Sequence, residues 1–400
     1  MRLKCVFVFS FITLGISSLI GQVIIIRELM NTFYGNEFFI GLTLAFWLFW
    51  VAIGALLVFP PKQGLRYFTL LILCHILIAL CLPLEIFLIR WVRSLFGIPA
   101  EIPNLLFSII STAFILAPLC LILGFQFSLA SRLFSQQRSD QKTVHSIGKG
   151  YLFETIGFII GGLGFSYFLI HQNEFLASAV VALFNLTASI LITFTTFTNK
   201  LPRTILSRSY QDDTRTFIKY LSALTLFLII TTLCLFFLSN YANHYTNQLR
   251  FPKQNLIEAK NSIYGSIAVT KTGKQFNFFE NGILLGSTQK TAFNEYVTHF
   301  PLLYHPNPKK ILLIGGGLSG ALNEILKYQP EKIYYVELDS QLIEITAKYL
   351  PSDLKQARSD PIIEIINTDG RYFLKNTNEK FDVIIVNLPD PSTALINRFY

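Results

Sequence analysis

The sequence predicts a multi-pass α-helical membrane domain followed by a Rossmann-like α/β domain, with a small β-hairpin region where the two join. Three observations lead to this fold class. The chain of 400 residues is 52% hydrophobic and only 14% charged, a composition that a soluble protein does not need. Most of the apolar excess lies before residue 240. From Lys310 to Asp339, strand, glycine turn, helix and strand follow one another in the layout of a nucleotide-binding βαβ unit.

The expected division has four parts. Residues 1–240 form the membrane domain, 241–261 a juncture, 262–308 a small β region with a helix, and 309–400 the Rossmann-like domain. The chain stops soon after a fourth predicted strand, whereas a doubly wound sheet usually has more strands to cover both faces. We therefore expect the 400 residues to be part of a longer protein.

Seven segments are apolar over the length of about 20 residues that a helix needs to cross a bilayer. They are Leu3–Ile26, Phe38–Phe59, Tyr67–Leu88, Leu105–Leu129, Ile147–Ile170, Phe175–Phe197 and Phe217–Leu238. The first has Arg2 and Lys4 at its start, and a signal peptide also begins with basic residues. Its apolar region is too long and no small-residue cleavage site follows, so we expect an anchor. All five cysteines lie inside these segments, which argues against a disulfide framework and a zinc site.

The net charge of +9 comes mostly from loops between the predicted spans. Basic residues follow the second, fourth and sixth spans: Lys62, Arg66, Arg132, Arg138, Lys142, Lys149, Lys200, Arg203, Arg208, Arg215 and Lys219. The alternate loops hold only Arg27, Arg90 and Arg93. By the positive-inside bias, the N-terminus is cytoplasmic, and seven spans would leave the C-terminal domain outside the cytoplasm. The basic run at 200–219 then indicates topology and lipid contact rather than nucleic-acid binding.

Two carboxylates, Glu85 and Glu154, fall within or near predicted spans. Ionisable residues inside a membrane are functional candidates by default, although either side chain could instead lie at the membrane interface. Gly157 and Gly161 follow Glu154 with the spacing that favours close packing of helices.

The region after the membrane domain has the pattern of a hairpin. Ser262–Val269 alternates like a strand, Thr272–Gly273 supplies a turn and Gln275–Glu280 makes a second strand. Asn281–Gly282 is a further turn, and Ala292–Tyr304 has helical spacing. After a break at Pro306 to Pro308, strands are expected at Ile311–Ile314, Lys332–Glu337, Ile362–Asn367 and Asp382–Val386, with helices at about Leu322–Lys327 and Gln341–Tyr349.

The glycines after the first of these strands fit G-x-G-x-x-G through Gly315, Gly317 and Gly320, with Gly316 inside the motif. The first glycine permits a tight turn, the second lets a ligand approach the backbone, and the third lets helix and strand pack closely. The amides that open the helix favour an anionic or polar group. A plain strand-to-helix turn is the alternative.

Carboxylates follow the later strands. Glu337, at the tip of the second strand, can accept both hydroxyls of a ribose. Asp339 suits either the same site or the N-cap of the next helix. Asp369, followed by Gly370, can reach an adenine amino group or simply close a turn.

Two polar residues follow the fourth strand, at the carboxyl edge where α/β sheets hold their substrates. Asn387 comes directly after that strand, and Asp390 precedes Pro391. Asp390 is expected either to bind a cationic amine or to belong to a turn that Pro391 fixes.

From Ser262 to Tyr400 the chain resembles the polyamine aminopropyltransferases, the spermidine synthases, in a membrane-fused form. The matching pieces are SIYGSIAVT, FFENG, HFPLLYHPNPKKILLIGGG, YYVELD, NTDGRYF and FDVIIVNLPDPST. The resemblance implies a small β domain ahead of a methyltransferase-like Rossmann domain, and decarboxylated S-adenosylmethionine as the donor. Glu337 would hold its ribose, Asp369 its adenine, and Gly315 and Gly317 would line its chain.

The sequence departs from that family where the amine would react. Leu318 stands in the place of an Asp that grips the donor's amine, and Asn387 in the place of the Asp that acts as base. Asn281 replaces another Asp. The acidic pair and the Tyr-His of the substrate helix are replaced by Gln289, Lys290, Thr291, Phe293 and Asn294, while Glu295 and Asp390 remain. The nucleotide half of the site is kept and the amine half is largely lost.

The expected function is that of a membrane-bound transferase of polyamine biosynthesis, moving an aminopropyl group to an amine, with no metal. A catalytically silent sensor or transport partner that binds a nucleoside or polyamine is the first alternative, and an S-adenosylmethionine methyltransferase the second. The expected partners are a small-molecule amine or nucleoside and the lipid bilayer of an inner or plasma membrane, without nucleic acid. A homo-oligomer is also an open option.

Overall fold

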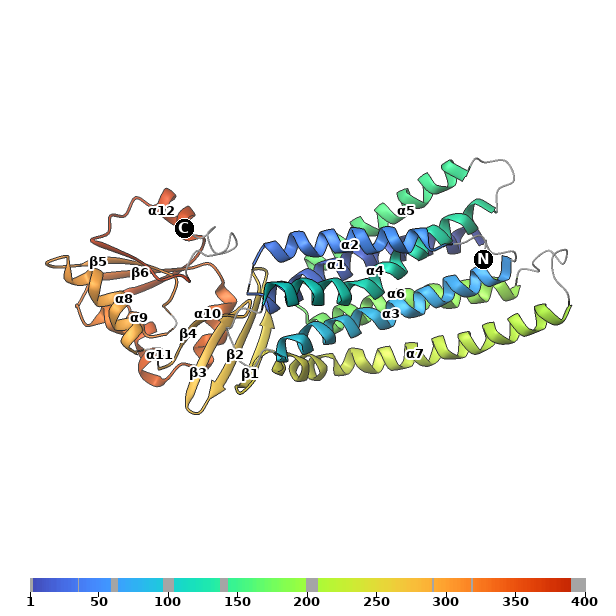
Figure 1. The fold of residues 1–400 in the computed structure, drawn as a ribbon. Coiled ribbons are helices and arrows are strands. Elements are labelled where there is room, and N and C mark those ends of the chain that lie inside the picture. Colours follow the sequence, from blue (N-terminus) through green and yellow to red (C-terminus); the bar gives the residue numbers. More distant parts are fainter. Residues whose placement is uncertain are drawn as a thin grey trace. The chain divides into compact units, whose positions relative to one another are not determined.

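The computed structural model describes residues 3–34, 36–58, 64–95, 104–136, 143–198, 208–289, 291–317 and 319–389. The chain divides into two compact units (Figure 1). The membrane unit comprises Met1–Leu29, Phe38–Leu95 and Pro103–Thr246, and the C-terminal unit comprises Met30–Glu37, Phe96–Ile102 and Asn247–Tyr400. We describe each unit by itself.

The membrane unit is a bundle of long helices. They are α1 (Leu3–Thr32), α2 (Phe38–Leu56), α3 (Gly64–Ser94), α4 (Leu105–Gln136), α5 (Thr143–Gly164), α6 (Glu174–Thr198) and α7 (Arg208–Gln248), with a short π-helix at Phe165–Leu169. Within the described residues, six helices are long and apolar enough to cross a membrane, and each corresponds to one of the first six predicted spans. The second and fifth predicted spans run past the ends of their helices at Leu56 and Leu169, and Phe59 lies outside the described residues. The seventh predicted span lies in α7. This helix is long and apolar enough to cross a membrane only if Lys219–Cys234 and Phe236–Gln248, which meet at an angle of 66°, are taken together as one span.

Small residues let α1 and α5 pack closely, as the spacing of Gly157 and Gly161 predicts. A Cβ atom added to Gly157 would lie 2.2 Å from the carbonyl oxygen of Ile12, and one added to Gly161 would lie 3.1 Å from the Cα of Ile16. On the facing helix, a Cβ on Gly15 would lie 2.1 Å from the carbonyl oxygen of Glu154. Backbones this close leave no room for a side chain, which is how small residues bring helices together in a membrane.

A buried arginine joins four helices at one end of the bundle. Arg90 of α3 is fully buried, and its Nη2 lies 2.7 Å from Glu28 Oε1 of α1 and 2.8 Å from Glu174 Oε2 of α6. Its Nη1 donates to Asn243 Oδ1 and Thr246 Oγ1 of α7, at 2.8 and 2.7 Å. The guanidinium therefore has hydrogen-bond acceptors on three sides, the condition under which a buried charge is tolerated.

The C-terminal unit begins with an antiparallel meander in the order β1-β2-β3-β4. Its strands are β1 (Asn255–Asn261), β2 (Ser266–Thr272), β3 (Gln275–Glu280) and β4 (Ile283–Ser287). The predicted hairpin is confirmed as β2 and β3. Within the expected juncture at 241–261, α7 continues to Gln248 and β1 occupies Asn255–Asn261, a strand that the sequence analysis did not predict. The polar sequence NLIEAKN forms a strand because its backbone pairs with β2.

A parallel sheet in the order β7-β6-β5-β8 completes the unit. Its strands are β5 (Lys310–Ile314), β6 (Lys332–Glu337), β7 (Ile363–Asn367) and β8 (Val383–Val386), and all four match predicted strands. The helices are α8 (Thr291–Leu303), α9 (Ala321–Leu326), α10 (Ser340–Tyr349), α11 (Ser352–Arg358) and α12 (Gly370–Asn376). The fold class predicted from sequence is confirmed.

The register of the sheet brings the carboxyl ends of its strands together. Ile314, the last residue of β5, pairs with Val336 on one side and Val386 on the other. The strand order reverses at β5, and this is the place where open α/β sheets form a ligand crevice. The core beneath it contains Ile311, Leu313 and Tyr335 together with Phe278 of the meander, so that both sheets share one core.

Candidate functional site

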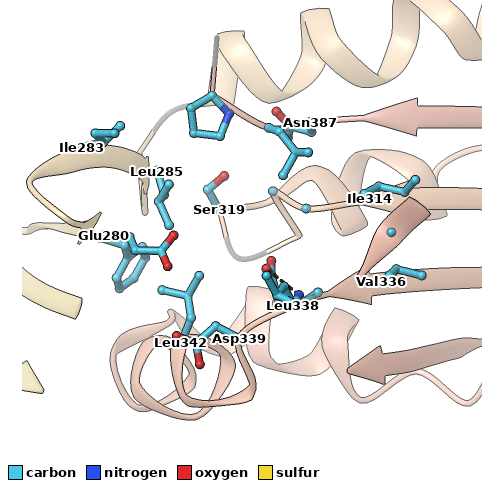
Figure 2. A pocket seen from close by; sticks show the side chains of 18 of the residues that line it. Glu280, Ile283, Leu285, Ile314, Ser319, Val336, Leu338, Asp339, Leu342 and Asn387 are labelled. Carbon is cyan, nitrogen blue, oxygen red and sulfur yellow. Dashed lines mark hydrogen bonds between the residues drawn. The ribbon is translucent and has the colours of Figure 1, made fainter. Parts of the chain in front are cut away.

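A pocket opens at the carboxyl edge of β5, β6 and β8. Its described lining consists of Phe278, Glu280, Asn281, Ile283, Leu284, Leu285, Gly286, Phe293, Ile314, Gly315, Gly316, Ser319, Val336, Glu337, Leu338, Asp339, Leu342, Thr368, Gly370, Asn387, Leu388 and Pro389. Figure 2 shows Glu280 and Leu285 on the side of the meander, and Leu338 and Asp339 beyond the end of β6. The pocket therefore lies between the β3–β4 hairpin and the edge of the parallel sheet.

The glycine turn after β5 forms the floor of this pocket. Gly315 and Gly316 have φ angles of +70° and +67°, which residues with a side chain rarely adopt. A Cβ on Gly315 would lie 2.5 Å from Leu388 Cδ2, and one on Gly316 would lie 2.2 Å from Asn387 Nδ2. Glycine is thus required at both positions, and the backbone of the turn is open to a ligand on its pocket side.

The other two glycines of the motif have a different surrounding. A Cβ on Gly317 would lie 2.6 Å from the ring of Tyr335, so this glycine permits contact between the turn and β6. Gly320 has φ +116° and is the N-cap of α9. Neither belongs to the described lining, and their assignment to a cofactor stays a prediction. Leu318 and Asp390, which the sequence analysis also singled out, lie outside the described residues.

Asn294 connects α8 to the glycine turn through two hydrogen bonds. Its Nδ2 donates to the carbonyl oxygen of Ser319 at 2.5 Å, and Ser319 Oγ donates to Asn294 Oδ1 at 3.2 Å. Asn294 is buried, whereas Phe293 beside it is half exposed and lines the pocket. The position that the family resemblance assigns to a histidine is therefore used here to position the turn.

Glu337 lies at the end of β6 and faces the pocket. The Tyr335 hydroxyl donates to its Oε2 at 2.8 Å, and the backbone N–H of Leu338 donates to its Oε1 at 3.1 Å. Burial raises the pKa of the carboxyl from its usual 4.5 to about 7, and the two hydrogen bonds oppose that rise only in part. Near neutral pH the pocket therefore holds this carboxyl in both protonation states.

The Asp339 side chain caps a helix and also lines the pocket. Its Oδ1 accepts the N–H of Gln341 at 2.9 Å, so the side chain caps α10, one of the two roles that the sequence allowed. It is also buried and lines the pocket, and its Oδ2 has no hydrogen-bond partner among the residues that the structure describes. The second oxygen is therefore a buried acceptor in a residue that lines the pocket.

Asp369 caps the helix that follows β7. Its Oδ1 accepts the N–H groups of Arg371 and Tyr372 at 2.9 and 3.0 Å. Thr368 and Gly370 on either side of it line the pocket, whereas Asp369 is absent from the described lining. Contact between the Asp369 carboxyl and an adenine remains a prediction.

Asn387 stands where β8 ends. Its backbone N–H donates to the carbonyl oxygen of Ile314 at 2.9 Å, which fixes the chain beside β5. Its side chain lies against Gly316 and lines the pocket. Figure 2 shows Asn387 at the end of its strand. The sequence analysis placed Asn387 at the carboxyl edge of the sheet, and its expected part in a reaction stays a prediction.

The meander side of the pocket was missed by the sequence analysis. Glu280, Leu284 and Leu285 come from β3 and β4, and Ser319 comes from the turn itself. A Cβ on Gly286 would lie 2.7 Å from Ser319 Cβ, which shows how closely β4 approaches the glycine turn. The available indication was the Asn281–Gly282 turn, which places Glu280 at the end of a strand.

Comparison with known proteins confirms the resemblance of the C-terminal part to the spermidine synthases. Residues 290–400 match the family model described as the spermine/spermidine synthase domain. A polyamine aminopropyltransferase of Caldicellulosiruptor saccharolyticus is 40% identical over 142 residues, which cover 34% of this chain and 50% of that protein. Polyamine aminopropyltransferase 1 of Aquifex aeolicus is 42% identical over 110 residues, covering 27% and 39%.

Solved structures give the same relatives. The chain is similar to a spermidine synthase in complex with the transition state analogue AdoDATO, at 32% identity and a TM-score of 0.33, over 36% of this chain and 50% of that chain. It is also similar to the spermidine synthase of Thermotoga maritima, at 33% identity and a TM-score of 0.31, over 33% and 47%. The chain spans about half the length of the first of the curated relatives.

The raised pKa of Glu337 predicts how stability changes with pH. A carboxyl whose pKa is higher in the folded state loses its contribution to stability as pH rises from its unfolded pKa through about 7. Glu337→Gln removes this titration and keeps an acceptor for the Tyr335 hydroxyl. Because the group is partly open to the pocket, we expect the variant to gain on the order of 1–2 kcal/mol relative to wild type above neutral pH.

Chemical denaturation at mildly acidic and mildly alkaline pH measures this difference. Glu344→Gln, on the exposed face of α10, is the matched control and should show no such pH dependence. A difference between Glu337→Gln and wild type that is the same at both pH values would contradict the prediction.

Proposed function

We propose that the C-terminal unit contains the donor site of a spermidine synthase-like transferase that moves an aminopropyl group from an S-adenosyl-type donor to an amine. The observation that carries the proposal is the pocket in which Gly315 and Gly316 lie beside Glu337 at the point where the strand order reverses. The sequence similarity to polyamine aminopropyltransferases supports it.

The side chains at the carboxyl edge suit a nucleoside. An ionised Glu337 accepts hydrogen bonds from both ribose hydroxyls, and Asp339 Oδ2 offers a further acceptor. Leu338 and Leu342 provide apolar surface for a base beside Thr368 and Gly370. The donor proposed here is decarboxylated S-adenosylmethionine, whose sulfonium carbon would lie toward the glycine turn and Asn387.

The transfer itself is a displacement in line. The lone pair of a neutral amine attacks the methylene carbon, the carbon–sulfur bond breaks, and its electrons stay on sulfur as a neutral thioether. The new secondary amine carries one proton too many, which a base must take. Asn387 cannot take it, because an amide is not a base near neutral pH. Its Oδ1 can only accept a hydrogen bond from the amine and so orient it.

Donor binding is the first test. Calorimetry of the full-length protein with decarboxylated S-adenosylmethionine, S-adenosylmethionine and methylthioadenosine should show binding of at least one of them. Loss of a hydrogen bond to a charged group costs about 1.5–3 kcal/mol, so Glu337→Gln should weaken binding about 10- to 100-fold. Glu344→Gln should bind like wild type. No binding of any of the three would refute the proposal.

Asn387 supplies the second test. Asn387→Asp restores a carboxylate beside the glycine turn and should raise the rate of aminopropyl transfer to putrescine, since a positioned base contributes about 10²- to 10⁴-fold. Asn387→Ala, which removes the amide without adding a base, is the control. An Asp variant no faster than wild type would show that Asn387 does not mark a lost base.

A catalytically silent sensor is the second candidate, and it rests on two observations. Asn387, Phe293 and Asn294 occupy the positions where the resemblance expects reacting groups, and Asn294 is buried in a structural role. In addition, α7 contacts α6 through Ser189 and Thr225 and meets Arg90 near its end. An α7 that crosses the membrane would bring the number of spans to seven. With a cytoplasmic N-terminus, the C-terminal domain would then lie outside the cytoplasm, as the sensor requires.

Membrane topology separates the two candidates. S-adenosyl donors are made inside the cell, so the transferase predicts a cytoplasmic signal from a reporter fused after Tyr400. A reporter fused in the loop after α2, where Lys62 and Arg66 predict the cytoplasm, is the control. A C-terminal signal from the opposite side would favour the sensor. Methyl transfer from labelled S-adenosylmethionine would favour the methyltransferase instead.

A further inference from the structure

Glu85 is a carboxyl in the core of the membrane unit that forms no ion pair with the residues that the structure describes. It lies on α3 with 1% of its surface exposed, and its Oε1 accepts the backbone N–H of Leu119 on α4 at 3.1 Å. Its Oε2 has no hydrogen-bond partner among the described residues. Glu28 and Glu174, two other buried carboxylates of this unit, both pair with Arg90. Glu85 therefore differs from them because no positive charge compensates its carboxyl among the described residues.

Two prolines explain why the backbone N–H of Leu119 can bond to a carboxyl on the neighbouring helix. Pro118 lies inside α4 directly before Leu119, and Pro83 lies inside α3 two residues before Glu85. Proline has no N–H and displaces the carbonyl of the preceding turn, so the regular ladder of hydrogen bonds is disturbed there. The Leu119 N–H is directed to the carboxyl of the neighbouring helix, and α3 and α4 are joined at their two irregular turns.

The groups around Glu85 are neutral or apolar. Within the described part of the chain, the titratable groups that interact with it are the thiols of Cys81 on its own helix and Cys120 on α4. Leu82, which precedes Glu85 by one turn of α3, and Leu119 of α4 both pack against α1, because a Cβ on Gly21 would lie 3.7 and 3.6 Å from their side chains. An ionised carboxylate in such surroundings, with one neutral donor, is strongly disfavoured, whereas a carboxylic acid is tolerated.

We propose that Glu85 is a reversible proton-binding site of the membrane unit. The proton is held on Oε2, while Oε1 keeps its hydrogen bond with the Leu119 N–H. Binding converts the carboxylate and a proton into a neutral acid, and release restores both without any other reactant. The same property makes Glu85 a modification site, because hydrophobic carbodiimides add to protonated carboxyls inside membranes and leave ion-paired carboxylates unmodified.

The test is labelling of the full-length protein in liposomes with dicyclohexylcarbodiimide, followed by peptide mass mapping. We expect the adduct at Glu85, none at Glu28 or Glu174, and a severalfold loss of labelling as the pH changes from mildly acidic to alkaline. Labelling that does not change with pH would show a proton that does not exchange. Protection of Glu85 by sodium or potassium ions would show a cation site instead. Either result, or the absence of the adduct, overturns the proposal.

A pair of variants tests the protonation state without the reagent. Glu85→Gln imitates the neutral acid and keeps an acceptor for the Leu119 N–H, so its melting temperature in detergent should equal that of wild type near neutral pH. Glu28→Gln removes a charge that Arg90 needs and should lower the melting temperature by several degrees. A Glu85→Gln variant that is destabilised as much as Glu28→Gln would show an ionised carboxylate at Glu85 and contradict the proposal.

Discussion

The candidate site depends on the absence of side chains in the turn between β5 and α9. Leu388 and Asn387 press on this turn from the end of β8, and Tyr335 presses on it from β6. Each neighbour lies where a Cβ atom would otherwise be. The two strands beside β5 can therefore close on the turn, and the backbone amides of the turn remain at the floor of the pocket. Any side chain here would move a strand end or block the ligand, and the positive φ of Gly315 and Gly316 adds a second reason for glycine.

The membrane unit handles its buried polar groups in two ways. At one end, Arg90 has carboxylates and neutral acceptors from α1, α6 and α7 around it. Removing one partner of such a buried pair leaves a charge uncompensated, at a cost of about 3–5 kcal/mol. Earlier along α3, Glu85 Oε1 accepts a backbone N–H, and its Oε2 has no hydrogen-bond partner among the described residues. The first arrangement fixes the positions of helices, and the second leaves a group that can change its charge.

Local patterns made most of the α/β fold predictable. The strands of the parallel sheet are short, mostly apolar runs, the glycine motif follows β5 directly, and Glu337 is the last residue of β6. β1 was missed because NLIEAKN shows no apolar alternation and depends on β2 for its hydrogen bonds. Glu280 and Leu285 were missed as pocket residues because the approach of β4 to Ser319 is a tertiary contact. Asp369 shows a further limit: a carboxyl after a strand caps a helix or binds a ligand, and the sequence is the same in both cases.

Tyr335 links the acidity of the pocket to the shape of its floor. Its ring fills the space beside Gly317, and its hydroxyl donates to Glu337. A ligand that prefers the ionised carboxyl must displace the proton that burial keeps there near neutral pH. Association would then release a proton to the solvent, and the measured heat would include the ionisation enthalpy of the buffer. The slope of that heat against the ionisation enthalpy of the buffer would give the number of protons released for each ligand molecule that binds.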